Sequence, residues 1–155
     1  MDIEKVYQRL IGEGGPDPIK AGWVERFVDS PVSFWCEIHA PADARDPMEP
    51  FVQHLFDTGH QHQTEVTEES YPDAVQEIFL TEEGGFRRTL ELMYHGERYI
   101  TNMPLLARPI GLEGRPDLLE RVDGIPSNLG NFGYRVVEIK SARNIRPSHT
   151  LQAAA

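Results

Sequence analysis

The stretch GRPDLLERVDGIPSNLGNFGYRVVEIK, residues 114–140, holds the side chains on which our prediction of the fold depends. Its last seven residues are rich in β-branched and aromatic side chains and follow a segment of Gly, Asn and Ser, so we expect a strand over residues 134–140. Residues two apart on a strand share a face. Glu138 and Lys140 should therefore lie side by side, while Ile139 points to the opposite face.

A further acidic residue belongs to the strand expected before this one. We expect that strand over residues 112–122, with Asp117 in its middle, and we expect the chain to reverse within residues 123–130, which contain an Asp-Gly step. Antiparallel strands joined in this way can bring Asp117 next to Glu138. Two carboxylates beside an ammonium group form a site suited to Mg²⁺ or Mn²⁺. The alternative is a salt-bridged pair of strands on a solvated sheet face.

Chain length and composition indicate a globular protein of one domain. The chain has 155 residues, of which 39% are hydrophobic and 26% are charged, enough for a real core. Its net charge of −10 argues against a simple nucleic-acid binder, although a basic groove can be local or supplied by another domain. We find no apolar run of membrane-spanning length and no signal-peptide pattern at the N-terminus, so we expect a cytoplasmic protein with no membrane partner.

A helix upstream of these strands carries three histidines. We expect it to begin at an acid–proline pair, at residues 46–47 or 49–50, and to end before Pro72. Five positions spaced three or four apart form the face that should pack on the core: Val52, Leu55, Gly59, His62 and Val66.

His62 lies on this face, whereas His54 and His60 lie off it and are expected to be solvated. A histidine on such a face is either a metal ligand or a hydrogen-bonded core residue. A zinc site built from the three histidines is disfavoured, because residues two apart on a helix point in different directions.

The remaining chain predicts further helices and one more strand. We expect helices over residues 3–11, 21–28, 32–39 and 82–95, the last with Thr81 as its cap and Gly96 as its stop signal. Residues 74–80 form either a strand or irregular chain, and residues 97–106 form the first strand of the central sheet. The side chains expected to pack in the core from these helices are Trp23, Phe27, Phe34, Trp35, Phe86, Leu90 and Met93.

The pattern Pro116-Asp117, followed by Glu138-Ile139-Lys140, resembles the signature of the PD-(D/E)XK nuclease superfamily. Gly59 and His62 match the Gly-x-x-His pattern of its RecB-like members, which lies on a helix upstream of the sheet. The resemblance covers about residues 31–155. It implies an α/β fold with a restriction-endonuclease-like core, in which a mixed central β-sheet is flanked by helices.

The resemblance also implies the chemistry. His62, Asp117, Glu138 and the Ile139 carbonyl would hold one or two Mg²⁺ or Mn²⁺ ions, and Lys140 would orient the attacking water. The implied reaction is hydrolysis of phosphodiester bonds in DNA, with single-stranded DNA or DNA ends as the substrate, in repair or recombination.

The resemblance further predicts a last helix carrying Gln-x-x-x-Tyr. We expect a helix over residues 149–155, capped by Ser148, in which Gln152 stands at the glutamine position and contacts the substrate or supports the site. The tyrosine would fall one residue past Ala155, so we expect a fragment of a longer protein with further domains or a helicase partner.

Two other classes of protein remain open. The first is a nuclease-fold module that does not cleave and instead has a structural or DNA-positioning role in a larger assembly. The second is a zinc or iron–sulfur protein that uses Cys36 with nearby histidines. Cys36 is the single cysteine and has no partners for a cluster within the chain, so we expect a buried thiol.

Overall fold

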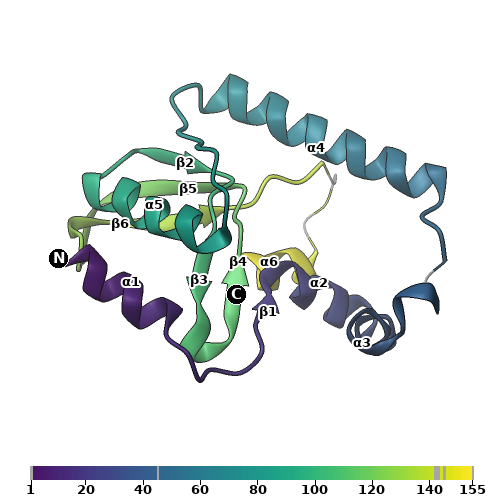
Figure 1. Cartoon of the computed structure of the whole chain (residues 1–155). Helices are drawn as coiled ribbons and strands as arrows, with labels where there is room; N and C mark the ends of the chain where they lie inside the picture. The colour runs from purple at the N-terminus through teal and green to yellow at the C-terminus, as the bar shows by residue number, and fades with distance from the viewer. Residues whose placement is uncertain (1, 45, 142–143, 145, 155) are drawn as a thin grey trace.

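The computed structural model describes residues 2–44, 46–141, 144 and 146–154, and for Ala42 and Gln152 it describes the backbone alone. The described chain is a mixed α/β structure (Figure 1), so the predicted class is confirmed. Its helices are α1 (Ile3–Ile11), α2 (Ala21–Asp29), α3 (Pro31–His39), α4 (Pro50–Ser70), α5 (Glu82–His95) and α6 (Pro147–Ala154), with 3-10 turns η1 (Ala42–Ala44) and η2 (Arg108–Ile110). Its strands are β1 (Ile19–Lys20), β2 (Tyr99–Thr101), β3 (Leu105–Ala107), β4 (Leu112–Gly114), β5 (Leu118–Ser127) and β6 (Gly130–Val137).

Local capping explains why the helices begin and end where they do. The Asp2 carboxylate accepts a hydrogen bond from the Lys5 amide at the start of α1, and the Thr81 hydroxyl accepts one from the Gly84 amide at the start of α5. Gly96 ends α5 in the left-handed conformation, with φ of 77°, which glycine adopts without a steric penalty. These boundaries confirm the predictions for the first helix and for the helix after Thr81.

The other helices differ little from the prediction. Glu49 precedes Pro50 at the start of α4, so the second of the two acid–proline pairs opens this helix. α6 begins at Pro147, two residues before the expected start, so Ser148 lies within the helix and does not cap it.

The strands of the described chain form two sheets of three strands each, in place of the single central sheet that we expected. In one sheet β4 lies between β1, to which it is parallel, and β3, to which it is antiparallel. In the other, β5 lies between β2 and β6 and is antiparallel to both. Residue Val75 adds a parallel bridge to Ile100 on β2. These two sheets do not confirm the restriction-endonuclease-like core with one mixed central sheet, which stays a prediction.

Two segments contribute strands to both sheets, because each is interrupted where we expected a continuous strand. The segment over residues 97–106 is divided into β2 and β3, and the segment over residues 112–122 is divided into β4 and β5. Asp117 is therefore not in the middle of a strand but immediately before β5. The interruptions coincide with Pro104 and Pro116, which lack the amide proton that a continuous ladder requires.

The predicted end of the next strand and the predicted turn are also wrong in detail. β6 ends at Val137, so Glu138 and Lys140 follow the strand instead of lying on it. β5 continues through the Asp-Gly step to Ser127, with an irregular register after Asp123, and the chain reverses at residues 128–129.

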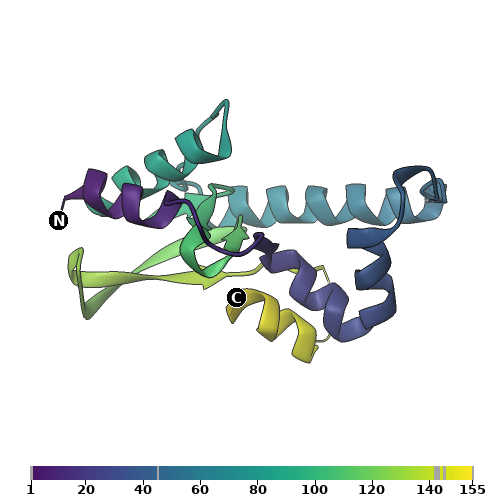
Figure 2. The ribbon, with the colours of Figure 1, turned by 60° about the horizontal axis from the view of Figure 1, so that its bottom comes forward.

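The core lies between α1, α5 and the sheets, as Figures 1 and 2 show. One cluster joins α1, α5 and β3 through the side chains of Tyr7, Phe86, Leu90 and Leu106. A second cluster joins α5 to β2, to β5 and to the short segment between β2 and β3. Its buried side chains are Leu92, Ile100, Met103 and Leu119. Phe86 and Leu90 are buried as predicted, whereas Met93 is half-buried and packs against the second cluster.

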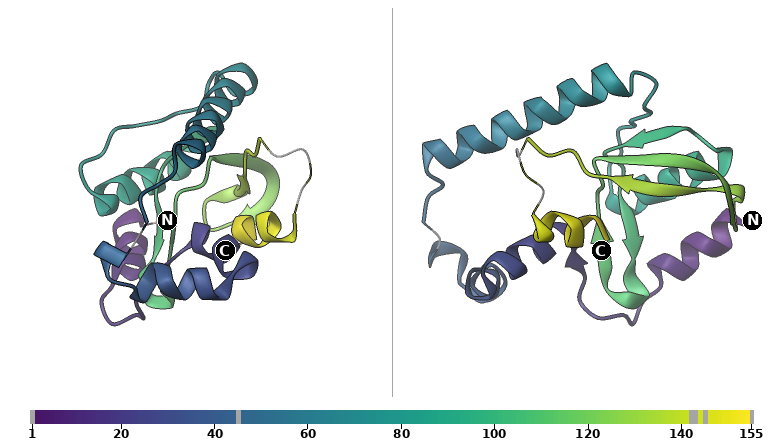
Figure 3. Two further views of the ribbon diagram at one scale, coloured as in Figure 1. Left: turned by 90° about the vertical axis from the view of Figure 1, so that its right-hand side faces the viewer. Right: turned by 180° about the vertical axis from the view of Figure 1, so that it is seen from behind.

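The expectation that α2, α3 and α4 contribute buried residues is wrong, since none of their described side chains is buried. Phe27 and Trp35 are more than half exposed, and Trp23 meets Phe34 edge to face at 5.9 Å on the surface of the α2–α3 pair. Cys36 is an exposed free thiol and not a buried one. α4 extends away from the sheets, and its amino-terminal end lies far from them (Figure 3).

The described helices include none that is both long enough and apolar enough to cross a bilayer.

Candidate active site

The two strand interruptions meet at one corner between the sheets. The backbone carbonyl of Asp117 accepts hydrogen bonds from the Thr101 hydroxyl at 2.7 Å and from the Asn102 amide at 3.3 Å. Asn102 has a positive φ of 53°, a conformation that asparagine tolerates better than most residues. The corner thus holds the backbone of Asp117 in place from the neighbouring segment.

The carboxylate of Asp117 faces the end of β6. Its Oδ2 accepts a hydrogen bond from the Ile139 amide at 2.7 Å. Burial raises the pKa of Asp117 above its ordinary value of 3.8, and the charge of Glu138 raises it further. The Ile139 hydrogen bond and the charges of Lys140 and His60 act in the opposite direction and lower it.

Glu138 and Lys140 form an ion pair just after β6. The Lys140 Nζ lies 2.7 Å from Glu138 Oε1 and 3.9 Å from Glu25 Oε2 on α2. Glu25 also lies 3.4 Å from His149 Nε2 on α6. The lysine is therefore placed between an acid beside Asp117 and an acid from the helical side of the molecule.

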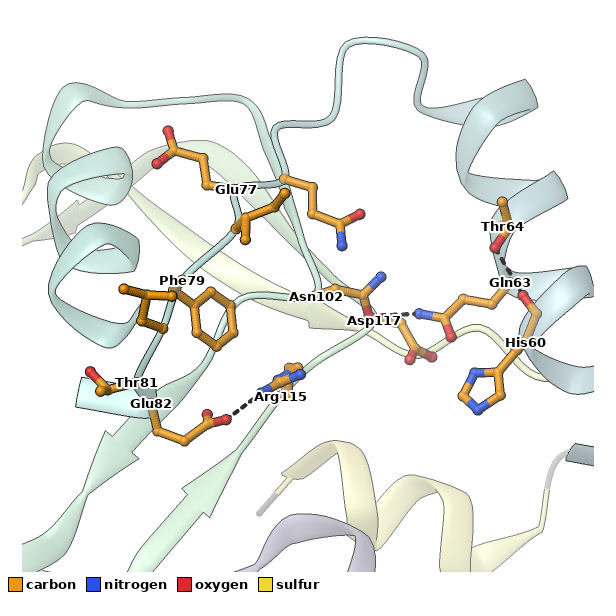
Figure 4. Close-up of a pocket in the computed structure, with 13 residues that line it drawn as sticks. His60, Gln63, Thr64, Glu77, Phe79, Thr81, Glu82, Asn102, Arg115 and Asp117 are labelled. Atoms are coloured by element: carbon orange, nitrogen blue, oxygen red, sulfur yellow. Dashed lines mark hydrogen bonds and ion pairs between the residues drawn. The ribbon is translucent and has the colours of Figure 1, made fainter. Parts of the chain in front are cut away.

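A pocket of about 800 Å³ opens beside Asp117 (Figure 4). Its walls come from α4, from the extended segment over residues 76–82 and from the strand interruptions, which contribute Asn102, Arg115 and Asp117. The Gln63 amide nitrogen donates to Asn102 Oδ1 at 3.0 Å, and this contact ties α4 to the corner. The pocket has room for a nucleotide-sized group next to the carboxylate.

The imidazole that α4 brings to this pocket is that of His60. The wall formed by α4 consists of His60, Gln63 and Thr64, which share one face of the helix. His62 is half-buried and lies outside this set of lining residues. A helix turns by about 100° per residue, so His62 projects from nearly the opposite side to His60. The structure thus brings together Asp117, Glu138, Ile139 and Lys140, with His60 in place of His62.

The last predicted site residue is Gln152. Its backbone belongs to α6, but its side chain lies outside the described part of the structure.

The donor set partly fits a divalent metal ion. Among the described residues there is no group of three or more His, Cys, Asp or Glu side chains arranged to hold a metal. Glu138 is close enough for its charge to raise the pKa of Asp117, and a divalent cation would relieve that repulsion. Carboxylates and a backbone carbonyl are the oxygen ligands that Mg²⁺ and Mn²⁺ prefer.

Several residues of the corner were missed by sequence reasoning. His60 was expected to be solvated because it lies off the apolar face of α4, and it is indeed exposed, but on the wall of the pocket. Gln63, Asn102 and Glu25 carry no motif. The sequence signal that could have found Asn102 is the Asn-Met-Pro step within an apolar segment, which is typical of an interrupted strand.

Comparisons of this chain with models of protein families, with curated proteins and with solved structures give no match.

Proposed function

We propose that this protein is a metal-dependent DNA nuclease that hydrolyses phosphodiester bonds, with single-stranded DNA or DNA ends as its substrate. The observation that carries the proposal is the proximity of Asp117, Glu138 and Lys140 at one corner, although Asp117 is separated from the other two by about twenty residues. Asp117 also lines the pocket beside this corner. This proposal places the protein in the PD-(D/E)XK class of RecB-like nucleases, with a role in repair or recombination in the cytoplasm. Further domains or a helicase would supply the basic surface that a chain of net charge −10 lacks.

Each residue of the corner has a distinct role in this proposal. Asp117 and Glu138, with the Ile139 carbonyl, would hold Mg²⁺ or Mn²⁺. The Lys140 ammonium group pairs with Glu138 at 2.7 Å, so it lies beside a carboxylate that would hold the metal. From there it would orient the attacking water and stabilise the negative charge that develops on it. His60 supplies the imidazole that the resemblance assigned to His62, because His60 lines the pocket. The bound metal ion would polarise the scissile phosphate and lower the pKa of a water molecule.

The test is cleavage of a labelled single-stranded oligonucleotide in Mg²⁺ or Mn²⁺. We expect Asp117→Ala and Lys140→Ala to reduce the cleavage rate by at least about 100-fold, the scale of losing one charge-stabilising group. His60→Ala should reduce it more than His62→Ala does, and His54→Ala is a matched control on the same helix. Retained circular dichroism would show that the variants fold. Equal cleavage by wild type and Asp117→Ala would overturn the proposal.

Metal binding can be measured separately from cleavage. A ligand that binds the folded state raises the midpoint of thermal unfolding. We expect Mn²⁺ to raise the midpoint for the wild type and to have no such effect on Asp117→Asn or Glu138→Gln, which remove the charges that attract the ion. A Glu120→Gln variant is the control, because Glu120 lies on β5 and pairs with Arg135 at 2.6 Å.

One observation favours a second candidate, a nuclease-fold module that positions DNA without cleaving it. Among the described side chains no group of three or more His, Cys, Asp or Glu is arranged to hold a metal, as expected of a module that binds no catalytic ion. Binding of single-stranded DNA without any Asp117-dependent cleavage would favour this module over the enzyme.

A further inference from the structure

The segment over residues 75–80 forms one wall of the pocket and alternates between inward and outward side chains. Val75 bridges to β2 and packs against the core cluster of Ile100 and Met103. Beyond it Glu77 and Phe79 are half-buried, whereas Ile78 and Leu80 are fully exposed, at 100% and 101% of their reference areas. This alternation is that of an extended chain with one face on the protein.

The inward residues fix the segment firmly. The Glu77 carboxylate accepts two hydrogen bonds from the Arg88 guanidinium, at 2.7 Å and 2.8 Å, a bidentate geometry that fixes orientation. The same contact lowers the pKa of Glu77, so the pair stays charged at neutral pH. The segment is therefore tied to α5 by an ion pair and not by its outward side chains.

Phe79 is the second anchor. Its ring lies so close to Gly85 on α5 that a Cβ there would come within 2.7 Å of the Phe79 ring, so only glycine permits this approach. The Arg115 guanidinium lies over the same ring, 5.0 Å from its centre. Phe79 is thus in contact with both a helix and an arginine that lines the same pocket.

These anchors hold two large apolar side chains in water beside the Asp117 pocket. A single exposed apolar residue is common, but two that are fully exposed on a well-anchored segment at a pocket are typical of a contact site. We name Ile78 and Leu80 the apolar ridge. Asp117, Arg115 and His60 line the same pocket, so charged and apolar groups face a common space.

We propose that the apolar ridge contacts the bases of the DNA strand whose phosphate lies at Asp117. A nucleotide combines a charged phosphate with flat apolar base faces. Arg115 in the pocket is paired with Glu82, so under the proposed function the phosphate would bind through the metal ion at Asp117, while the ridge offers an apolar surface to the base. Isoleucine and leucine side chains insert between bases in other DNA complexes and partly unstack them, and contacts with the flat faces of unpaired bases tolerate any sequence. The inference rests on the proposed function, because it requires DNA at this pocket.

The experiment compares two labelled oligonucleotides of equal length, oligo-dT and a fully abasic strand, by fluorescence anisotropy in Ca²⁺. The two strands share their phosphates and differ in their bases. We expect the double variant Ile78→Gln/Leu80→Gln to weaken binding of oligo-dT by about tenfold and to leave binding of the abasic strand within about twofold. The control is Ile110→Gln/Leu55→Gln, two substitutions of exposed residues away from the pocket, which should change neither affinity.

An equal loss for both strands, or no loss for either, would overturn the ridge as a base contact. Self-association of the wild type that the ridge variant abolishes, measured by sedimentation, would overturn it in favour of a contact with protein.

The same proteins separate this inference from the proposed function. Cleavage of both oligonucleotides that depends on Asp117 but is unchanged in the ridge variant would contradict the ridge as a base contact and would still support the nuclease. Binding selective for oligo-dT and dependent on the ridge, without cleavage, would sink the nuclease and leave the ridge as a DNA contact. Absence of both binding and cleavage would overturn both.

Discussion

The two sides of this molecule are built differently. The helices α1 and α5 and the strands against them contain nearly all the buried apolar side chains of the described chain, including Phe86, Ile100 and Leu118. The helices α2, α3 and α4 contain none, and they leave Trp35, Phe51 and other large apolar residues exposed. The first side is stabilised by burial of apolar area, whereas the second is held by its helical hydrogen bonds and by the packing of α2 against α3 and α6.

The candidate site lies where the two sides meet. Asp117 belongs to the side with the core, and His60 and Gln63 belong to α4 on the other side. One half of the site is therefore fixed by packing, while the other half depends on contacts such as the hydrogen bond from Gln63 to Asn102. We expect local opening of α4 to cost less free energy than unfolding of the sheets.

The largest expected difference between the two sides is the one between truncating a leucine on each of them. Leu118→Ala should lower the free energy of unfolding by about 2–5 kcal/mol, because Leu118 is 0% exposed and its loss leaves a cavity. Leu55→Ala should change it by about 0.5 kcal/mol or less, because Leu55 is 54% exposed on α4. Urea denaturation measures both. Similar losses for the two variants would show that α4 is covered in solution.

A buried hydroxyl on α5 should give the next largest effect. The Thr89 hydroxyl is fully buried and lies 2.9 Å from the Pro104 carbonyl and 3.0 Å from the Gly85 carbonyl. Thr89→Val should lower stability by about 1–3 kcal/mol, because the Pro104 carbonyl loses its partner. Thr64→Val is the control, since the exposed Thr64 hydroxyl donates to the His60 carbonyl within α4. Thermal denaturation should show no more than about 0.5 kcal/mol for the control.

Asp117 should make the fold less stable as its carboxylate ionises. Its pKa in the folded state is raised above the ordinary 3.8, so the folded state binds more protons and this group's contribution falls as the pH rises between the two values. Asp117→Asn removes the charge, and its amide oxygen can still accept from Ile139. We expect the variant to match the wild type at pH below 3.8 and to be more stable than the wild type at neutral pH.

The measurement is the difference in free energy of unfolding between Asp117→Asn and wild type across that pH range, in the absence of divalent ions. A difference that is constant with pH would contradict the raised pKa of Asp117.

The smallest effect on global stability should come from the contact between the two sides. Gln63→Ala removes the hydrogen bond to Asn102 and should cost about 0.5 kcal/mol of global stability. Its effect should be clearer in hydrogen exchange, where the amides of α4 should exchange faster than in the wild type. Gln61→Ala is the matched control, because the exposed Gln61 side chain donates to Glu65 within α4 itself. Equal exchange in both variants would show that this contact does not hold α4 to the corner.

Sequence patterns predicted the local structure well where one residue type fixes the backbone. The helix ends at Thr81 and Gly96 follow from capping and from the left-handed conformation of glycine, both of which act within a few residues. The strands were less predictable. Residues 97–106 and 112–122 each mix apolar with charged residues, and composition does not say that each segment divides between two sheets.

The site shows the same division. The sequence by itself determined the order of Pro116-Asp117 and Glu138-Ile139-Lys140 along the chain. The spacing of two residues also predicted that Glu138 lies beside Lys140, as their ion pair shows. Only the tertiary structure decided that His60 and not His62 lines the pocket, and that Glu25 from α2 reaches Lys140. The physical reason is that packing against other elements decides which face of a helix is turned towards the pocket. Contacts between distant segments are not encoded in local propensity.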